Sequence, residues 1–402
     1  MQHRSNAPPG IQTLAVHAGE AVDPVTRASS PNLVMSATFA PEALTGFSAR
    51  NRGSYEGFVY ARVSNPTVRQ LEEKLAALEN AEAALAFASG MAASHALLAG
   101  RLSAGDHLVI SDANYVGTAE LVRDSLPRFG IAVSPVDTSD LDAVDGAVTP
   151  RTKMVWLETP ANPVLRLSDI AAIAELAHRR GVRDVVVDST FASPISTRPL
   201  DLGADFVIHS LTKYIGGHGD AMGGAVLGRR ADLDALNLEA TVHYGGVLSP
   251  FNAWLILRGA ATLPLRMRAH EESAMAVARF LEGHRAVKRV LYPGLPSHPQ
   301  HGLARRQMRN FAGMMAFQTH EDGRRIAERM VERLEVIHHA VSLGHHRSLV
   351  YWIPTADLMR SSFRLEGEAL RRYEEFAGAG VFRLSVGIED AADLCADLDR
   401  AL

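Results

Sequence analysis

The chain contains a single cysteine, few aromatic residues and no excess of either charge. Cys395 stands alone, which excludes a disulfide framework and any zinc or iron–sulfur site built from several cysteines. The 41 basic and 45 acidic side chains leave a net charge of −4, so no overall field favours nucleic acid or an anionic membrane. No stretch reaches the roughly 18 apolar residues of a membrane helix, and the first residues lack the apolar core of a signal peptide. We therefore expect a cytoplasmic protein without a nucleic-acid or membrane partner.

The rest of the composition is that of an ordinary soluble protein of 402 residues, 47% hydrophobic and 21% charged. This length is enough for two or three domains. Residues 1–55 lack periodicity and carry proline and glycine at irregular intervals, so we expect an extended N-terminal arm there. We interpret residues 56–255 as a large central α/β domain and residues 256–402 as a smaller C-terminal α+β domain.

Short apolar runs alternate with helical segments through the middle of the chain. The first helix is predicted from Asn65, an N-cap residue followed by Pro66. The apolar runs lie at 83–88, 107–110, 153–157, 183–187, 205–208 and 224–227. Helical spacing recurs over 90–102, 118–128, 168–180 and 263–284, with later helices at 321–334 and 390–402 and strands at 314–318 and 381–386. Continuous hydrophobicity indicates strands buried on both faces, so the fold class is α/β with a mainly parallel central sheet.

Two strand ends carry the densest group of chemically reactive side chains. Asp188 ends one apolar run, and Lys213 follows another, between the hydroxyl residues Ser210 and Thr212. Open α/β sheets bind ligands at the carboxyl ends of their strands, and an unpaired buried charge is costly. Pyridoxal phosphate (PLP) requires a Schiff-base lysine and an acid at its pyridinium nitrogen, so the pair fits that cofactor. A solvated turn lysine with turn-stabilising hydroxyls is the alternative at this point.

A second anion-binding feature follows the run at 83–88. Ser89 and Gly90 come directly after the strand and open a helix, where free backbone amides and the helix dipole favour a phosphate. Ser89 is also an ordinary N-cap residue, so this feature alone has two interpretations.

Three rival motifs fail. Ser210 and Lys213 match the S-x-x-K pattern of serine acyl enzymes, but the companion S-D-N and K-T-G motifs are missing. The glycines at 217–223 do not fit the dinucleotide fingerprint. The histidine pairs at 338–339 and 345–346 lack accompanying acidic or thiolate ligands, and we expect no metal.

In their order along the chain, these motifs resemble the Cys/Met-metabolism family of PLP-dependent enzymes. That family includes cystathionine γ-synthase, cystathionine lyases, methionine γ-lyase and the homoserine-ester sulfhydrylases. The similarity runs nearly end to end, from AVHAG at 15–19 to FRLSVG at 382–387. It implies the PLP-dependent transferase fold type I, PLP as cofactor, and a homo-oligomer, at least a dimer and usually a tetramer. It also implies elimination or replacement at Cγ of a homoserine- or homocysteine-derived amino acid.

The resemblance assigns the cofactor contacts residue by residue. Lys213 would form the Schiff base, and Asp188 would keep the pyridine nitrogen protonated so that the ring withdraws electrons. The residues that match the family's phosphate contacts are Ser89, Gly90, Met91, Ser210 and Thr212. Tyr60 and Arg62 match a segment that reaches the neighbouring subunit's site, Arg62 at the phosphate.

Further matches concern catalysis and the substrate. Tyr115 matches the tyrosine that stacks on the cofactor ring and takes part in proton transfer, and Tyr60 joins it in the catalytic set. Glu158 and Asn162 match the strand end beside the cofactor, Asn162 as a cofactor contact and Glu158 at the substrate. Arg383 matches the arginine that holds the substrate α-carboxylate in a two-pronged ion pair, assisted by Ser342.

The sequence also departs from the family pattern. The usual SLGGxESL reads SLGHHRSL at 342–349, which puts Arg347 where synthases and lyases often carry glutamate. An arginine facing the distal end of the substrate would favour an anionic or ester leaving group, whereas the alternative is an arginine turned to solvent. Gly219 occupies a position where the family usually has serine, and Ser189 occupies one where the family usually has asparagine.

The departures leave several activities open. The YWIP stretch at 351–354 replaces a histidine-containing segment, which weakens the match to a standard sulfhydrylase. Val116 and Gly117 replace the Gly-Cys of methionine γ-lyases. We expect a cystathionine γ-synthase or γ-lyase-like enzyme; the alternatives are a sulfhydrylase, or a γ-lyase for methionine or canavanine. A non-catalytic binding protein on the same scaffold is the competing class, against which the intact motif residues argue.

Overall fold

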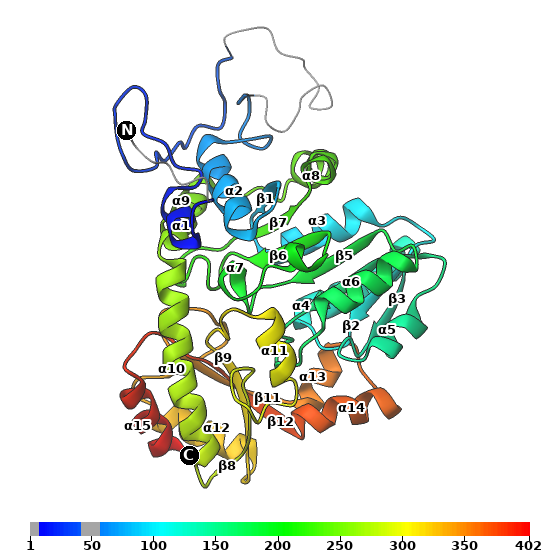
Figure 1. Cartoon of the computed structure of the whole chain (residues 1–402), viewed down its shortest axis with the longest axis vertical. Coiled ribbons are helices and arrows are strands. Elements are labelled where there is room, and N and C mark those ends of the chain that lie inside the picture. Colours follow the sequence, from blue (N-terminus) through cyan, green and yellow to red (C-terminus); the bar gives the residue numbers. More distant parts are fainter. Residues whose placement is uncertain (1–7, 42–56) are drawn as a thin grey trace.

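The structure is a computed structural model that describes residues 8–41 and 57–402. Figure 1 shows a large sheet in one part of the molecule and a smaller sheet in the other, with helix α10 (Leu263–Gly283) running along one side. Over the described ranges, no helix is long and apolar enough to span a membrane.

The larger sheet has seven strands and is mainly parallel, as the sequence predicted. In sheet order it reads β1-β7-β6-β5-β4-β2-β3, and only β7 runs antiparallel to its neighbours. Its strands are β1 (Ala83–Phe87), β2 (His107–Ser111), β3 (Ala132–Val136), β4 (Thr152–Glu158), β5 (Asp184–Asp188), β6 (Phe206–Ser210) and β7 (Gly224–Gly228). The parallel strands all present their carboxyl ends at the same edge of the sheet.

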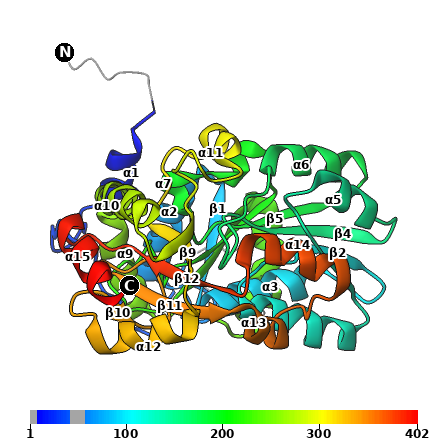
Figure 2. The same cartoon turned by 90° about the horizontal axis from the view of Figure 1, so that it is seen from below.

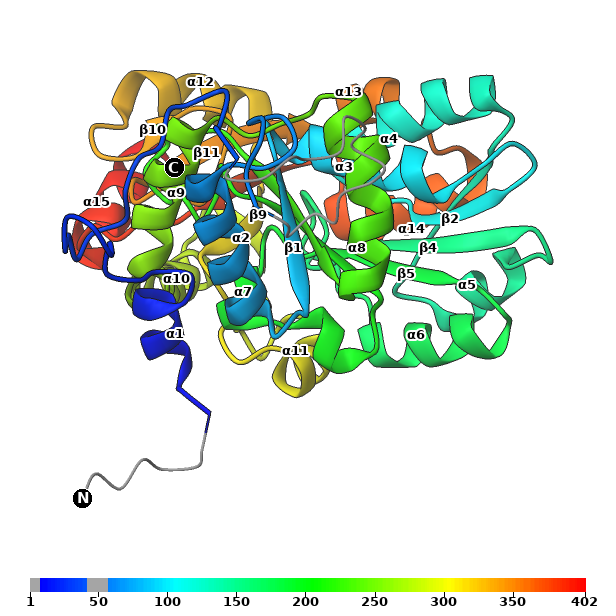
Figure 3. The same ribbon diagram turned by 90° about the horizontal axis from the view of Figure 1, so that it is seen from above.

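Helices cover both faces of this sheet, which is why its central strands are mostly apolar. On one face, Trp156 and Val186 pack with α3 (Gly90–Arg101) and α8 (Arg230–Asn237). On the other, Val155 and Val185 pack with α6 (Ile170–Arg179). Successive strand residues point to opposite faces, so each face receives every second side chain. Figure 3 shows α3 and α6 on opposite sides of β4 and β5.

The smaller sheet has five strands in the order β10-β11-β12-β9-β8, antiparallel except for the short β10–β11 pair. Its strands are β8 (Val287–Leu291), β9 (Met314–Thr319), β10 (His338–His339), β11 (Leu349–Pro354) and β12 (Gly380–Ser385). Helices α10, α12 (Gly323–Arg333) and α15 (Ala391–Ala401) share an apolar cluster with it. Figure 2 shows α12 and α15 beside these strands.

The remaining helical elements are between 4 and 14 residues long. The α-helices are α1 (Ile11–His17), α2 (Pro66–Glu79), α4 (Val116–Glu120), α5 (Leu141–Ala147), α7 (Ser193–Ser196), α9 (Pro250–Ala261), α11 (His301–Gln307), α13 (Thr355–Ser361) and α14 (Gly367–Ala377). Single π or 3₁₀ turns occupy Leu121–Ser125, Leu126–Phe129, Pro199–Leu202 and Leu238–His243. The expected N-terminal arm lies partly outside the described residues.

Some predicted elements differ from those observed. Helix α1 lies in the arm that we expected to be extended, where the side chain of Ala15 is fully buried. The helix expected over 118–128 ends as a π turn and a 3₁₀ turn, because Pro127 supplies no amide hydrogen to a continuing α-helix. Strand β3 has partly exposed residues and includes Pro135, so it gave no apolar run and sits at the sheet edge. The proposed domain boundary between residues 255 and 256 falls inside α9.

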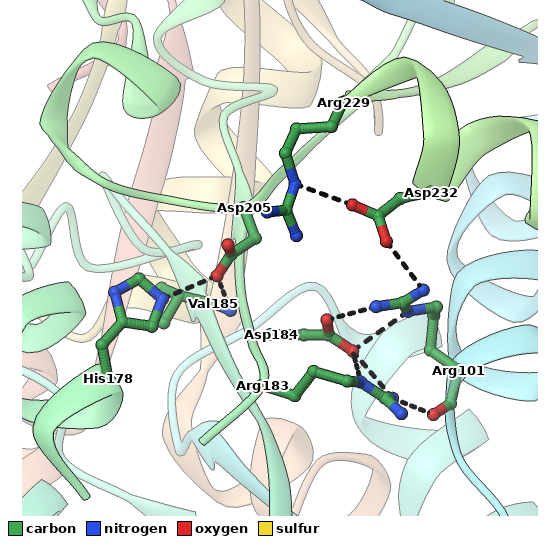
Figure 4. Close-up of polar contacts among 8 residues, drawn as sticks. All are labelled: Arg101, His178, Arg183, Asp184, Val185, Asp205, Arg229 and Asp232. Atoms are coloured by element: carbon green, nitrogen blue, oxygen red, sulfur yellow. Dashed lines mark hydrogen bonds and ion pairs between the residues drawn. The ribbon is translucent and has the colours of Figure 1, made fainter. Parts of the chain in front are cut away.

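An ion-pair network fixes the amino end of β5 to its covering helices (Figure 4). The buried carboxylate of Asp184 accepts hydrogen bonds from Arg101 at 2.7 and 3.1 Å and from Arg183 at 2.9 Å. Arg101 also pairs with Asp232 at 3.1 Å, and Asp232 accepts from Arg229 at 2.8 Å. The three arginines thus pair with both carboxylates, and the pairs join α3 and α8 to the strand. The ion pairs at the amino end of β5 are structural. A ligand site is therefore expected at the carboxyl end of the strand.

Candidate active site

Lys213 lies in a tight turn that follows β6. The amide of Gly217 donates to the carbonyl of Lys213 at 2.7 Å, and that of Gly216 donates to Leu211 at 2.9 Å. The Lys213 ammonium donates to Ser342 Oγ at 2.9 Å. Burial lowers the pKa of Lys213 to about 8, and the charge of Arg383 adds to this effect. The lysine is therefore a partly buried amine that can lose its proton near neutral pH.

Arg266 of α10, which no motif in the sequence marks, holds the turn that contains Lys213. Its guanidinium donates to the carbonyls of Tyr214 at 2.7 Å, Ile215 at 3.2 Å and Gly259 at 2.7 Å. Gly217 has φ of 71°, and a Cβ there would lie 2.0 Å from Arg266 Nη1, so this position requires glycine. Burial lowers the pKa of Arg266 to about 10. In sequence Arg266 is one of many helical arginines, and only the tertiary contact distinguishes it.

Two carboxylates end adjacent strands of the central sheet. Glu158 of β4 and Asp188 of β5 are register partners, so they lie side by side. Burial raises the pKa of Asp188, and the hydrogen bond from the Thr190 amide at 3.0 Å opposes this shift. Burial also raises the pKa of Glu158, and the adjacent charge of Asp188 raises it further. A nearby cation or a shared proton would relieve this repulsion.

Glu158 organises the two loops beside it. Its carboxylate accepts from the amide of Tyr115 at 2.7 Å and from the amide of Asn162 at 2.8 Å. The Tyr115 ring is half exposed and packs over Gly117, where a Cβ would lie 2.6 Å from Tyr115 Cε1 and 3.1 Å from Met91 Sδ. Glu158 therefore positions Tyr115 and Asn162 through their backbones, and its expected contact with the substrate stays a prediction.

Arg383 reaches the same edge from β12 in the smaller sheet. It donates to Asn162 Oδ1 and to the Ser342 carbonyl, both at 3.1 Å. Burial lowers the pKa of Arg383, and the charge of Glu158 counters this shift. Ser342 adopts φ of 98°, an unfavourable backbone conformation for a residue with a side chain, held by its contacts with Lys213 and Arg383. The structure thus brings together Lys213, Ser342, Arg383 and Asn162, which are distant in sequence.

The expected phosphate contacts also converge. Ser89 caps α3 by accepting from the Ala92 amide at 3.1 Å, so the amides of Gly90 and Met91 precede the first intrahelical bond. A Cβ on Gly90 would lie 3.0 Å from the Cβ of Ser210, which places the start of α3 against the end of β6. Thr212 Oγ1 accepts from the Gly223 amide at 3.1 Å in the adjacent turn.

Three predicted residues lie exposed, away from these contacts. Arg62 donates to the carbonyl of Val242, and its guanidinium lies 5.5 Å from the centre of the Tyr60 ring. The side chain of Tyr60 is 46% exposed, and Arg62 and Arg347 are exposed as well. Within one copy of the chain, Tyr60 and Arg62 therefore make their contacts with residues other than Lys213 and Asp188.

The residues present fit PLP. Lys213 with its lowered pKa matches the aldehyde of PLP, and the Asp188 carboxylate at the end of β5 matches the ring nitrogen. The start of α3, beside hydroxyl side chains, matches the phosphate. Ser189 Oγ, next to Asp188, is buried and has no hydrogen-bond partner among the described residues. In the same part of the chain, no group of three or more His, Cys, Asp or Glu side chains could hold a metal ion.

Comparison with known proteins places the chain in a family. The model of the Cys/Met metabolism PLP-dependent enzymes matches residues 12–402. The chain is 46% identical to cystathionine gamma-synthase of Mycobacterium tuberculosis over 98% of its length and 97% of that protein. It is 42% identical to canavanine gamma-lyase of Pseudomonas canavaninivorans, covering 97% and 95% of the two chains. The crystal structure of metB from Corynebacterium glutamicum superposes with a TM-score of 0.88 at 37% identity, covering 98% of each chain.

The fold, the strand-end residues and these matches agree. The chain belongs to the Cys/Met metabolism family of PLP-dependent enzymes, with the α/β architecture of the type I fold and PLP as its cofactor.

Proposed function

We propose that the protein catalyses γ-replacement on a homoserine ester, with the thiol of cysteine as the incoming group, as in the cystathionine γ-synthase reaction. In this reaction the Cγ–O bond breaks, the acid leaves as a carboxylate, and a Cγ–S bond forms as the thiol loses its proton. The observation that carries the proposal is the link from Lys213 through Ser342 to Arg383. It sets a proton-accepting amine beside a carboxylate-binding guanidinium, as an α-amino acid substrate requires.

The cofactor contacts follow from the site. We assign the amides of Gly90 and Met91 with the hydroxyls of Ser89, Ser210 and Thr212 to the phosphate, Asp188 to the ring nitrogen and Lys213 to the aldehyde carbon. When bound, PLP withdraws electrons from the α- and β-carbons of an attached amino acid. Tyr115 and Asn162 would hold the ring, and Glu158 fixes the backbones of both.

Lys213 acts as the base at the substrate. With a pKa of about 8, about a tenth of its free amine carries no proton at pH 7, and that amine can take the α-proton at Nζ. Ser342 Oγ, 2.9 Å away, holds the released amine in place between proton transfers. The half-exposed ring of Tyr115 is assigned to the further proton transfer.

Arg383 binds the α-carboxylate. Its guanidinium is oriented by Asn162 Oδ1 and the Ser342 carbonyl at 3.1 Å each, which leaves its other N–H groups for the substrate. Glu158 reduces the cost of keeping this charge buried. Arg347 is exposed and is assigned to the far end of the substrate, where its charge suits an ester that carries a second carboxylate.

The site is completed by a second copy of the chain. Tyr60 and Arg62 are exposed, and large apolar side chains of the N-terminal segment and of α9 are exposed as well. They include Val16 at 47%, Met35 at 63% and Phe251 at 47% exposure. A surface of this kind favours burial against another subunit, and we assign Tyr60 and Arg62 to the partner's site in a dimer, two of which form a tetramer. The cytoplasmic location stays a prediction from sequence.

A substrate panel tests the proposed reaction. Purified protein is given O-acyl homoserines, cystathionine, methionine or canavanine, each with and without cysteine, and the products are identified by mass spectrometry. We expect cystathionine from an O-acyl homoserine with cysteine, and none from the Lys213→Ala control. Keto-acid formation from canavanine or methionine exceeding cystathionine formation would contradict the proposal and assign a γ-lyase instead.

A further inference from the structure

His345, which departs from the family pattern, is linked to Lys213 through the hydroxyl group of Ser342. His345 Nε2 lies 3.3 Å from Ser342 Oγ, which in turn accepts from the Lys213 amine at 2.9 Å. The three side chains thus form one chain of polar contacts that ends on the reactive nitrogen. We propose that His345 is a positioning residue that, through the Ser342 hydroxyl, aims and holds the free amine of Lys213.

A second departure makes room for this histidine. Gly219 replaces a residue that carries a side chain in the family pattern, and it adopts φ of 73°. A Cβ at this position would lie 2.7 Å from His345 Cε1 and 2.8 Å from Nδ1, closer than non-bonded atoms approach. The ring therefore occupies the space that a serine at 219 would fill. His345 and Gly219 form a matched pair rather than two independent changes.

The surroundings of His345 favour its neutral form. The titratable or charged groups nearest to it are Lys213, Asp220, His346 and Arg347, with Arg383 beyond Lys213 and His218 against His346. Burial lowers the pKa of His345, the positive neighbours lower it further, and Asp220 opposes them. A neutral ring accepts the Ser342 hydroxyl hydrogen at Nε2, which turns the Oγ lone pairs toward the amine. A protonated ring would donate to Oγ and compete with Lys213 for the same lone pairs.

This inference rests on the proposed role of Lys213, and it concerns the lysine only while its amine is free. That condition holds in the apoenzyme before PLP is attached. Attachment joins Lys213 Nζ to the aldehyde carbon of PLP with loss of water, and it requires an unprotonated, correctly aimed amine. The rate of PLP attachment therefore reports on His345 without any substrate turnover.

The test follows covalent attachment of PLP to apoenzyme by absorbance over a range of pH. We expect His345→Ala to attach PLP about fivefold more slowly than wild type at neutral pH, because one hydrogen bond that aims the nucleophile is lost. His345→Gln keeps an acceptor that does not titrate, so it should retain most of the rate and lose the inflection that wild type shows at acid pH. His346→Ala is the matched control and should change the rate less than twofold.

A double-variant cycle tests the link to Gly219. Gly219→Ser should slow attachment in the wild-type background, since the side chain displaces the imidazole. In the His345→Gly background, Gly219→Ser should slow attachment less than it does in wild type. The backbone strain at residue 219 is the same in both backgrounds, whereas the clash with the imidazole is absent without His345. Equal rates for wild type and His345→Ala, or an unchanged acid inflection in His345→Gln, would overturn the inference. If PLP attachment survives in Lys213→Ala, the proposed role of Lys213 fails instead.

Discussion

Replacement of Arg383 should weaken substrate binding much more than cofactor binding. Arg383→Ala removes a charge that is assigned to the α-carboxylate and that contacts Asn162 and Ser342 at 3.1 Å. Losing one partner of a buried, hydrogen-bonded charge pair costs about 3 kcal/mol, within a usual range of roughly 2 to 5. At about 1.4 kcal/mol per tenfold, kcat/KM should fall about 150-fold. Most of the loss should appear in KM, because the ion pair forms on binding.

The assay pairs steady-state kinetics with PLP titration of apoenzyme. Arg383→Ala should bind PLP with an affinity within about threefold of wild type, because the residues assigned to the aldehyde, the ring nitrogen and the phosphate stay in place and Arg383 reaches a cofactor contact only through Asn162 Oδ1. Arg383→Lys is the matched control, because it keeps the charge but loses the two-pronged geometry, and it should recover part of kcat/KM. A parallel loss of PLP affinity and kcat/KM would refute the assignment of Arg383 to the substrate carboxylate.

Three further changes test the fold, the lysine and the shared site. In apoenzyme, Lys213 binds fewer protons when folded than when unfolded between pH 8 and 10.5, so wild-type stability rises across that window. At pH 7 the free energy of unfolding of Lys213→Met should exceed that of wild type by at most about 3 kcal/mol, and this difference should shrink toward zero above pH 10.5. A difference that does not change with pH would contradict the burial of the amine. Arg101→Met removes a partner of the buried Asp184 carboxylate and should lower the free energy of unfolding, measured by chemical denaturation, by about 3 kcal/mol. The exposed Arg229→Ala should lower it by less than about 1 kcal/mol. Arg62→Ala and Lys213→Ala chains should each be inactive alone. If Arg62 serves the partner's site, mixing the two variants under dissociating conditions should restore part of the activity, because a mixed dimer then contains one site with both residues. A mixture that stays inactive would contradict a shared site.

The strand-end residues could be predicted from sequence because local pattern marks them. Asp188 and Lys213 are charges that directly follow buried apolar runs, and strand ends of a parallel sheet meet at one edge. Strands buried on both faces are apolar throughout, which is why six of the central strands were anticipated to within one or two residues. Edge strand β3 includes Pro135 and partly exposed positions, and its pattern resembles a loop.

The contacts that complete the site are long-range and leave no local signal. Arg383 meets Asn162 across 221 residues, and Lys213 meets Ser342 across 129. The family resemblance named these residues, but their mutual contacts follow only from the way β12 and the loop at Ser342 lie against the residues that follow β4 and β6. Arg266 and the two backbone bonds of Glu158 were not anticipated at all, since a helical arginine or a strand-end glutamate has the same sequence signature in solvent.

Lys213 is the residue to which we assign covalent attachment of PLP, and reductive trapping identifies the attached residue. Borohydride reduction of the yellow holoenzyme fixes PLP on the amine that holds it, and peptide mass spectrometry then locates the modified residue. We expect a single reduced phosphopyridoxyl group on the peptide that contains Lys213, and none in Lys213→Ala. A reduced group on another lysine, or on none, would contradict it.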